Sequence, residues 1–175
     1  DRSYIFVIRG TPLLVQIYLI YFGLGSIEFI RESFLWYLLR EPFWCGVLAL
    51  TINTVAYGSE IFRGGIQSIE KGQTEAAKTV GLNYVQTMRY VVLPQALRRI
   101  LPPLANQFIY IVKMSAFASV IGMQELTRRA NEIVVSEYRP LEVYTLLIFE
   151  YLILVLIISS GVRWLERKMG ADQRN

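Results

Sequence analysis

The sequence contains no histidine, and Cys45 is its only cysteine. Without histidine the chain cannot build a Ser-His-Asp or Cys-His catalytic group, and with one cysteine it cannot build a disulfide framework or a typical zinc site. A Walker-type Gly-x-x-x-x-Gly-Lys-Ser/Thr loop is also missing, since Arg63-Gly64-Gly65 is too short to cradle phosphates. We therefore expect no catalytic, metal or cofactor site in this chain.

Charged residues are scarce as well. They make up 18% of the 175 residues, against roughly 25% in an ordinary soluble domain. Hydrophobic residues make up 54%, and the mean hydropathy is +0.38. This composition predicts a membrane protein. The net charge of +4 is explained by basic residues beside membrane spans, so it does not call for a nucleic-acid partner.

Four apolar stretches reach the length of about 20 residues that a helix needs to cross a bilayer. The first is interrupted at Arg9-Gly10-Thr11-Pro12, where Pro12 marks a kink or the true start of the lipid-facing helix. We expect Pro102-Pro103 to open the third helix, because first-turn amides have no partner within a helix. The fold class is therefore all-α, a polytopic membrane helical bundle, with spans at residues 4–22, 42–62, 101–122 and 143–164.

The loops between these spans differ in charge. Residues 63–99 contain six basic and two acidic residues, and the tail from residue 163 contains four basic and two acidic residues. Residues 23–41 and 123–142 each carry a net charge of −1. Residues 23–41 are also expected to contain a short interfacial helix that places Trp36 and Tyr37 at headgroup level. Because cytoplasmic loops are the basic ones, residues 63–99 and the C-terminus should face the cytoplasm.

Residues 75–94 predict a helical hairpin. Residues 75–80 are good helix formers, and Gly81 stands where a left-handed residue would end that helix. Asn83 with Gln86 three residues later is typical of a capping box that starts a second helix. Pro94 is expected to stop the second helix, because proline lacks an amide and restricts the residue before it.

The same stretch resembles the cytoplasmic loop of ABC importer permeases, the transmembrane subunits of ATP-driven uptake systems. Glu-Ala-Ala at residues 75–77, Gly81 and Leu-Pro at residues 93–94 carry the resemblance, and Val91 stands where the family usually has isoleucine. In that family the loop docks into a cleft on the ATPase subunit. The resemblance implies coupling to an ATPase through Glu75, Ala76, Ala77, Gly81, Leu93 and Pro94. The alternatives are an amphipathic connector and a DNA-reading helix-turn-helix, which the membrane flanks argue against.

Two further stretches narrow the resemblance. Residues 9–16 and 53–66 look like hallmarks of the polar amino-acid uptake family, which has the type I importer fold. Residues 1–175 would then form one permease domain, with residues 63–99 as its cytoplasmic coupling loop. The resemblance implies a multi-pass protein of the bacterial cytoplasmic (inner) membrane, with five spans in the full chain, the first preceding Asp1.

The resemblance also implies partners and a mechanism. The partners are ABC ATPase subunits that carry ATP and Mg, a second permease chain that is identical or related, and a periplasmic or lipid-anchored amino-acid-binding protein. The mechanism is alternating access, in which ATP binding on the ATPase pair opens the spans outward and hydrolysis resets them. The rival functions are a secondary transporter or channel that works without an ATPase, and a membrane scaffold or receptor component.

Polar groups at mid-membrane depth are expensive and mark either a pathway or a buried pair. Lys113 and Asn53 lie near the middle of their spans, and in related importers the region around residues 112–115 helps to form an amino-acid site. Met114 replaces a polar residue of that family there, so a cationic substrate would lose a carboxylate partner. We therefore favour a neutral or acidic amino acid. The candidate substrate-binding residues are Asn53, Tyr57, Lys113, Met114, Ser115, Arg9 and Thr11.

Each candidate has a structural alternative. Lys113 could snorkel or pair with Glu150, and Asn53 could form a hydrogen bond between helices. Tyr57 could serve packing, while Arg9 and Thr11 could anchor a helix end. Glu60 and Arg63, spaced i, i+3, are expected to form a surface ion pair.

Overall fold

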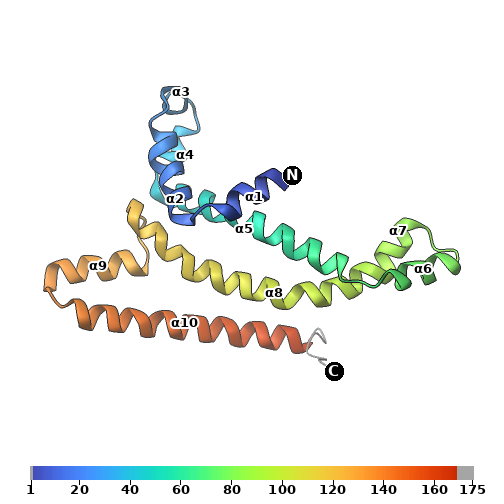
Figure 1. Ribbon diagram of the computed structural model, residues 1–175. Coiled ribbons are helices and arrows are strands. Elements are labelled where there is room, and N and C mark those ends of the chain that lie inside the picture. Colours follow the sequence, from blue (N-terminus) through green and yellow to red (C-terminus); the bar gives the residue numbers. More distant parts are fainter. Residues whose placement is uncertain (1, 169–175) are drawn as a thin grey trace.

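The computed structural model describes residues 2–168, and within this range every regular element is a helix (Figure 1). The all-α fold is therefore confirmed. Asp1 and the tail residues Asp172 and Arg174, which entered the charge counts above, lie outside the described residues.

Three long helices correspond to the second, third and fourth predicted spans. They are α5 (Pro42–Gln67), the path Tyr84–Ile121 that contains α8 (Leu93–Met114), and α10 (Pro140–Lys168). Each includes a window that is long and apolar enough to cross a membrane. Pro42 stands in the first turn of α5, where its missing amide costs no hydrogen bond. Helix α5 extends past residue 62, where the predicted span ended.

The first predicted span is broken. Helix α1 (Arg2–Gly10) is followed by α2 (Leu13–Tyr18) and the π-helical η1 (Leu19–Gly23), and the two halves meet at 103°. Pro12 has an extended backbone (φ −65°, ψ 135°) between them. The interruption predicted at Pro12 is thus a sharp bend, and the two halves form either a broken span or a re-entrant segment.

Shorter helices occupy the connections. Helices α3 (Glu28–Arg31) and α4 (Trp36–Leu39) confirm a short helix with Trp36 and Tyr37. Helix α9 (Leu126–Glu137) was expected to be loop. It begins where the Glu125 carboxylate accepts hydrogen bonds from the Thr127 and Arg128 amides at 2.9 and 2.6 Å. A glutamate cap is a weaker sequence signal than serine or asparagine, which is why the helix start was missed.

The hairpin contains α6 (Lys71–Thr79), α7 (Tyr84–Thr87) and the π-helical η2 (Met88–Val92). Gly81 has φ +84° and its amide donates to the Lys78 carbonyl, while the Leu82 amide donates to the Ala77 carbonyl, which is a Schellman motif. Asn83 and Gln86 form both hydrogen bonds of the capping box, at 2.9 and 3.0 Å. The left-handed Gly81 and the capping box are therefore confirmed.

Two predictions about proline are wrong. Pro94 does not stop the second helix, and Pro102-Pro103 do not open the third, because one helical path runs through all three residues. The Leu93 amide donates to the Met88 carbonyl five residues back, and this wider turn makes room for the ring of Pro94. Burial of Ala96 and Ile100 against α5 holds the helix together just before Pro102.

Helices α5 and α8 pack antiparallel and carry the centre of the fold (Figure 1). At one end, Ile69 of the α5–α6 connection packs with Val92, Ala96 and Ile100. Toward the other end, Cys45 and Ala49 of α5 pack with residues of α2, η1 and η3 (Ser115–Ile121): Leu13, Ile17, Ile20 and Ile121. A Cβ on Gly65 would lie 2.1 Å from Ile100 Cγ1, so glycine allows the two helices to approach this closely.

Replacing Gly65 by alanine is expected to destabilise the fold by about 1–3 kcal/mol, because the new methyl group would force α5 and α8 apart. Gly64→Ala is the matched control, since nothing lies within 4 Å of a Cβ at that position. Thermal unfolding of the purified chain in detergent, followed by circular dichroism, compares the two variants. Equal melting temperatures would contradict a close contact between α5 and α8.

Candidate functional site

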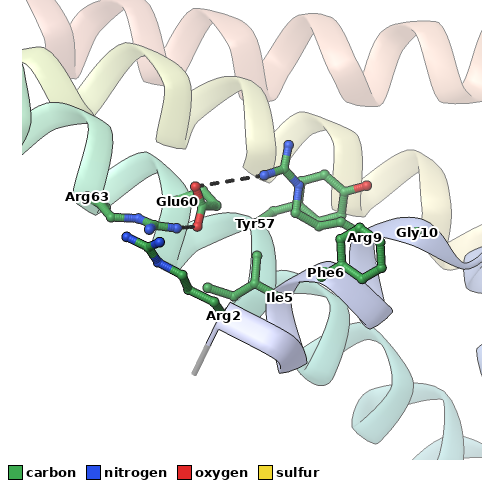
Figure 2. A pocket seen from close by; sticks show the side chains of 8 residues that line it. All are labelled: Arg2, Ile5, Phe6, Arg9, Gly10, Tyr57, Glu60 and Arg63. Atoms are coloured by element: carbon green, nitrogen blue, oxygen red, sulfur yellow. Dashed lines mark ion pairs between the residues drawn. The ribbon is translucent and has the colours of Figure 1, made fainter.

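A polar pocket opens between α1 and α5 (Figure 2). Its volume is about 740 Å³, and it is wide open on one side. Helix α1 supplies the apolar side chains of Ile5 and Phe6 as well as two arginines, and α5 supplies an aromatic ring and two charged groups. The residues that line it are Arg2, Ile5, Phe6, Arg9, Gly10, Tyr57, Glu60 and Arg63.

Arg9 connects the two helices of this pocket. Its guanidinium lies over the Tyr57 ring at 5.2 Å from the ring centre, and its Nη1 is 3.9 Å from Oε2 of Glu60 (Figure 2). Glu60 also forms the predicted i, i+3 ion pair with Arg63. With Arg2, three guanidinium groups and one carboxylate line the pocket, so it has an excess of positive charge. Such a pocket can accept a carboxylate or another anion.

A second pocket of about 320 Å³ lies between α5 and α8. Tyr57 lines both pockets, and its ring lies 6.3 Å from that of Tyr110. The second pocket also contains Asn106 and Gln107, and the buried Nε2 of Gln107 has no hydrogen-bond partner among the described residues. Asn106 and Gln107 fall inside the third predicted span, residues 101–122, but they were not among the candidate substrate-binding residues. The sequence alone does not predict that they lie opposite Tyr57, because this position depends on how α8 packs against α5.

Asn53 and Thr11 belong to a hydrogen-bonded network at the bend between α1 and α2. Asn53 is 5% exposed, and its Nδ2 donates to Oε1 of Gln16 at 3.2 Å. Gln16 Nε2 in turn contacts Oγ1 of Thr11 at 2.9 Å. This is the bond between helices that was the alternative for Asn53. Gln16 was missing from the candidate set, although an amide inside an apolar run, four residues after a proline, was a signal for it.

Lys113, Met114 and Ser115 lie apart from the pocket around Arg9. The antiparallel register of α5 against the path that contains α8 is fixed by three facing pairs: Gly65–Ile100, Tyr57–Tyr110 and Gly46–Ala118. This register places Lys113 and Asn53 at similar depth, as predicted. Lys113 is exposed. Met114 packs against the apolar cluster around Ile17, and the Ser115 hydroxyl donates to the Val112 carbonyl at 2.8 Å.

Lys113 and Glu150 do not form the ion pair that was the alternative for Lys113. Among residues 2–168, Lys113 has no ion-pair partner, and Glu150 lines a separate pocket of about 220 Å³ between α9 and α10, together with Arg129. No group of three metal-binding side chains gathers within the same described range.

The tip of the α6–α7 hairpin is exposed and partly apolar. Val80, Tyr84 and Val85 are each at least 70% exposed, while Ala77 is buried inside the hairpin. Glu75 and Ala76 are on the surface, and Leu93 and Pro94 are exposed where the hairpin joins α8. An exposed apolar tip carried by a well-capped hairpin is typical of a protein-docking surface.

Comparison with known proteins gives one matching family and several relatives. Residues 2–171 match the family described as "Binding-protein-dependent transport system inner membrane component". The octopine transport system permease protein OccM of Rhizobium radiobacter is 44% identical over 174 residues, covering 99% of this chain and 71% of that protein. The glutamine transport system permease protein GlnP of Escherichia coli K12 is 44% identical over 167 residues, covering 95% and 73%. The arginine ABC transporter permease protein ArtM of Haemophilus influenzae is 39% identical, covering 98% and 75%.

Solved structures share the fold. The crystal structure of an amino acid ABC transporter with histidines matches with a TM-score of 0.84 and 44% identity, over 95% of this chain and 74% of that one. The inward-facing MetNI methionine ABC transporter matches with a TM-score of 0.77 over 96% and 73%. Its identity of 19% makes it a likeness of fold alone.

The ring of Tyr57 is expected to hold α1 against α5. Tyr57→Leu should speed amide hydrogen exchange in α1 about fivefold, because a cation–π contact of about 1 kcal/mol is lost. Tyr57→Phe keeps the ring and should exchange like the parent protein. Hydrogen–deuterium exchange with mass spectrometry measures both variants. Equally slow exchange in Tyr57→Leu would contradict the role of the ring.

Proposed function

Because the chain belongs to the family of binding-protein-dependent transport system inner membrane components, we propose that its polar pockets form part of an amino-acid path and that residues 63–99 couple this path to an ATPase. The chain is a permease subunit of an ATP-driven amino-acid importer, and it is not itself an enzyme. The observation that carries the assignment to a path is that Tyr57 lines two pockets, each of which also contains polar side chains.

The path runs past Tyr57. The ring separates a pocket rich in guanidinium groups from a pocket lined by Asn106 and Gln107, so one side chain contacts both chambers. Arg9 supplies charge on one side, and on the other Nε2 of Gln107, which has no hydrogen-bond partner among the described residues, supplies a donor. Asn53 and Thr11, with their side chains engaged at the bend, shape the path by holding α1 and α2 against α5.

The charge of the path favours a substrate with a carboxylate. Lys113 is a cation inside the third predicted span, and it has no ion-pair partner among the described residues. Met114 beside it offers no anion. The three arginines of the first pocket outnumber Glu60. An α-carboxylate, with a neutral or acidic side chain, fits these groups better than a cationic side chain does. Relatives named for glutamine, octopine and arginine supply the first compounds to test.

The α6–α7 hairpin is the contact with the ATPase. Glu75, Ala76 and the exposed apolar tip dock into the partner, and Gly81 keeps the turn tight. Leu93 and Pro94 join the hairpin to α8, so a movement of the tip passes directly into a membrane helix. ATP and Mg bind to the partner ATPase pair, and closure of that pair drives alternating access.

The remaining partners follow from the family. They are a second permease chain, identical or related, and an amino-acid-binding protein at the outer face, periplasmic or lipid-anchored. The basic residues of 63–99 and of the C-terminal tail support a cytoplasmic position for the hairpin and the C-terminus at the bacterial inner membrane. Within residues 2–168 no observation favours a secondary transporter or channel that works without an ATPase.

Gly81→Asp is expected to leave membrane insertion intact and to abolish uptake. A side chain at φ +84° strains the turn by about 1 kcal/mol or more, and an added charge disturbs the docking surface. Gly72→Asp is the control, because Gly72 lies in the first turn of α6 with nothing within 4 Å of its Cβ and an acid there is favourable. The measurements are the amount of inserted permease, amino-acid uptake and ATPase activity in proteoliposomes that contain the permease, the ATPase and the binding protein. Full stimulation of the Gly81→Asp variant by liganded binding protein would count against coupling through this turn.

Lys113→Gln is expected to raise the KM for uptake about tenfold or more, because a substrate carboxylate would lose a charge-assisted hydrogen bond. Lys113→Arg keeps the charge and should stay within about threefold of the parent protein. Uptake of labelled glutamine and arginine into proteoliposomes gives both values. An unchanged KM in Lys113→Gln would show that Lys113 snorkels and does not meet the substrate.

A further inference from the structure

The break between α1 and α2 leaves backbone carbonyls without helical partners. The last carbonyl groups of α1 have no following helical turn to donate hydrogen bonds to them, because the chain turns by 103° and Pro12 has no amide hydrogen. Inside a membrane such groups must find partners within the protein. The bend therefore needs donors from elsewhere in the chain.

Gln16 supplies these donors. Its Nε2 lies 2.8 Å from the Ile8 carbonyl oxygen, 3.1 Å from the Thr11 carbonyl oxygen and 2.9 Å from Thr11 Oγ1. The Thr11 hydroxyl donates to the Val7 carbonyl at 2.9 Å. One side-chain amide of α2 thus replaces the missing continuation of α1.

The other end of the same amide is fixed by α5. Oε1 of Gln16 accepts the hydrogen bond from Asn53, and both side chains are buried, with 8% and 5% exposed. The orientation of the Gln16 amide is therefore set by a third helix. A second link between α1 and α5 joins the Tyr4 hydroxyl to the Ile52 carbonyl at 2.6 Å.

We propose that Gln16 is a positioning residue, which sets the angle of the α1–α2 bend and thereby holds Arg9 over Tyr57. Ile8, whose carbonyl Gln16 binds, directly precedes Arg9, so loss of this bond frees the turn of α1 that carries the guanidinium. Gln16 lines neither of the pockets that contain Tyr57. The inference rests on the proposed role of Arg9 in the substrate path.

The first test measures the bend itself. Gln16→Met keeps the size of the side chain and removes every donor, and Leu14→Met on the same helix is the control. Spin labels at residues 7 and 55, both more than half exposed, report the distance between α1 and α5 in the assembled transporter after Cys45→Ala. We expect a single narrow distance distribution in the parent protein and in Leu14→Met, and a broad one in Gln16→Met. A narrow distribution in Gln16→Met at the parent distance would overturn the proposal.

The second test asks whether Gln16 acts through Arg9. Gln16→Met and Arg9→Gln should each raise the KM for uptake about fivefold or more, and the double variant should be no worse than the poorer single variant. The substrate is whichever of labelled glutamine, arginine or octopine the parent protein takes up. Effects that multiply in the double variant would show that Gln16 acts independently of Arg9, which overturns the positioning role.

The two tests separate the inference from the function on which it rests. A broad distance distribution in Gln16→Met, with normal uptake by Arg9→Gln, would confirm that Gln16 holds the bend and would reject Arg9 as part of the path. A third variant completes the design. Gln16→Glu keeps the acceptor for Asn53 and, when ionised, lacks both donors, so it should behave like Gln16→Met.

Discussion

The close antiparallel contact of α5 with α8 is the interaction on which the rest of this structure depends. Gly65 allows Ile100 to pack directly against the backbone of α5, and Ala96 fills the adjoining turn. This contact fixes the register that brings Tyr57 opposite Tyr110 and sets Lys113 at the depth of Asn53. The hairpin of α6 and α7 connects the end of α5 to the start of α8, so both ends of the hairpin are held by one packed interface (Figure 1).

The local part of this structure was predictable from sequence. The spans follow from apolar length, and the hairpin follows from Gly81 and the Asn83–Gln86 pair, because each of these signals acts over a few residues. The prolines at 94, 102 and 103 misled the prediction. Proline disfavours a helix interior through its missing amide, but a π turn before Pro94 and packing of Ile100 against α5 outweigh that cost.

The site was predictable only in part, because its contacts join distant residues. Arg9 and Tyr57 were candidates on motif grounds, yet their stacking depends on the bend at Pro12 and on a hydrogen bond between residues 37 positions apart. Asn53 was a candidate for a ligand contact, and its side chain is engaged in that same bond. The roles of the other candidates stay predictions.

The unbroken helical path of residues 84–121 gives the molecule a mechanical property. Its 38 residues, at about 1.5 Å per residue, measure about 57 Å along the helical path, well beyond the roughly 30 Å of a hydrocarbon core. The path begins at Tyr84 in the hairpin and ends at Ile121, which packs with Leu13 and Ile17 of α2. Tilting it about its middle by about 10° would move each end by about 5 Å in opposite directions. A tilt that starts at the hairpin would therefore also displace the residues that pack under α2 at the other end of the path.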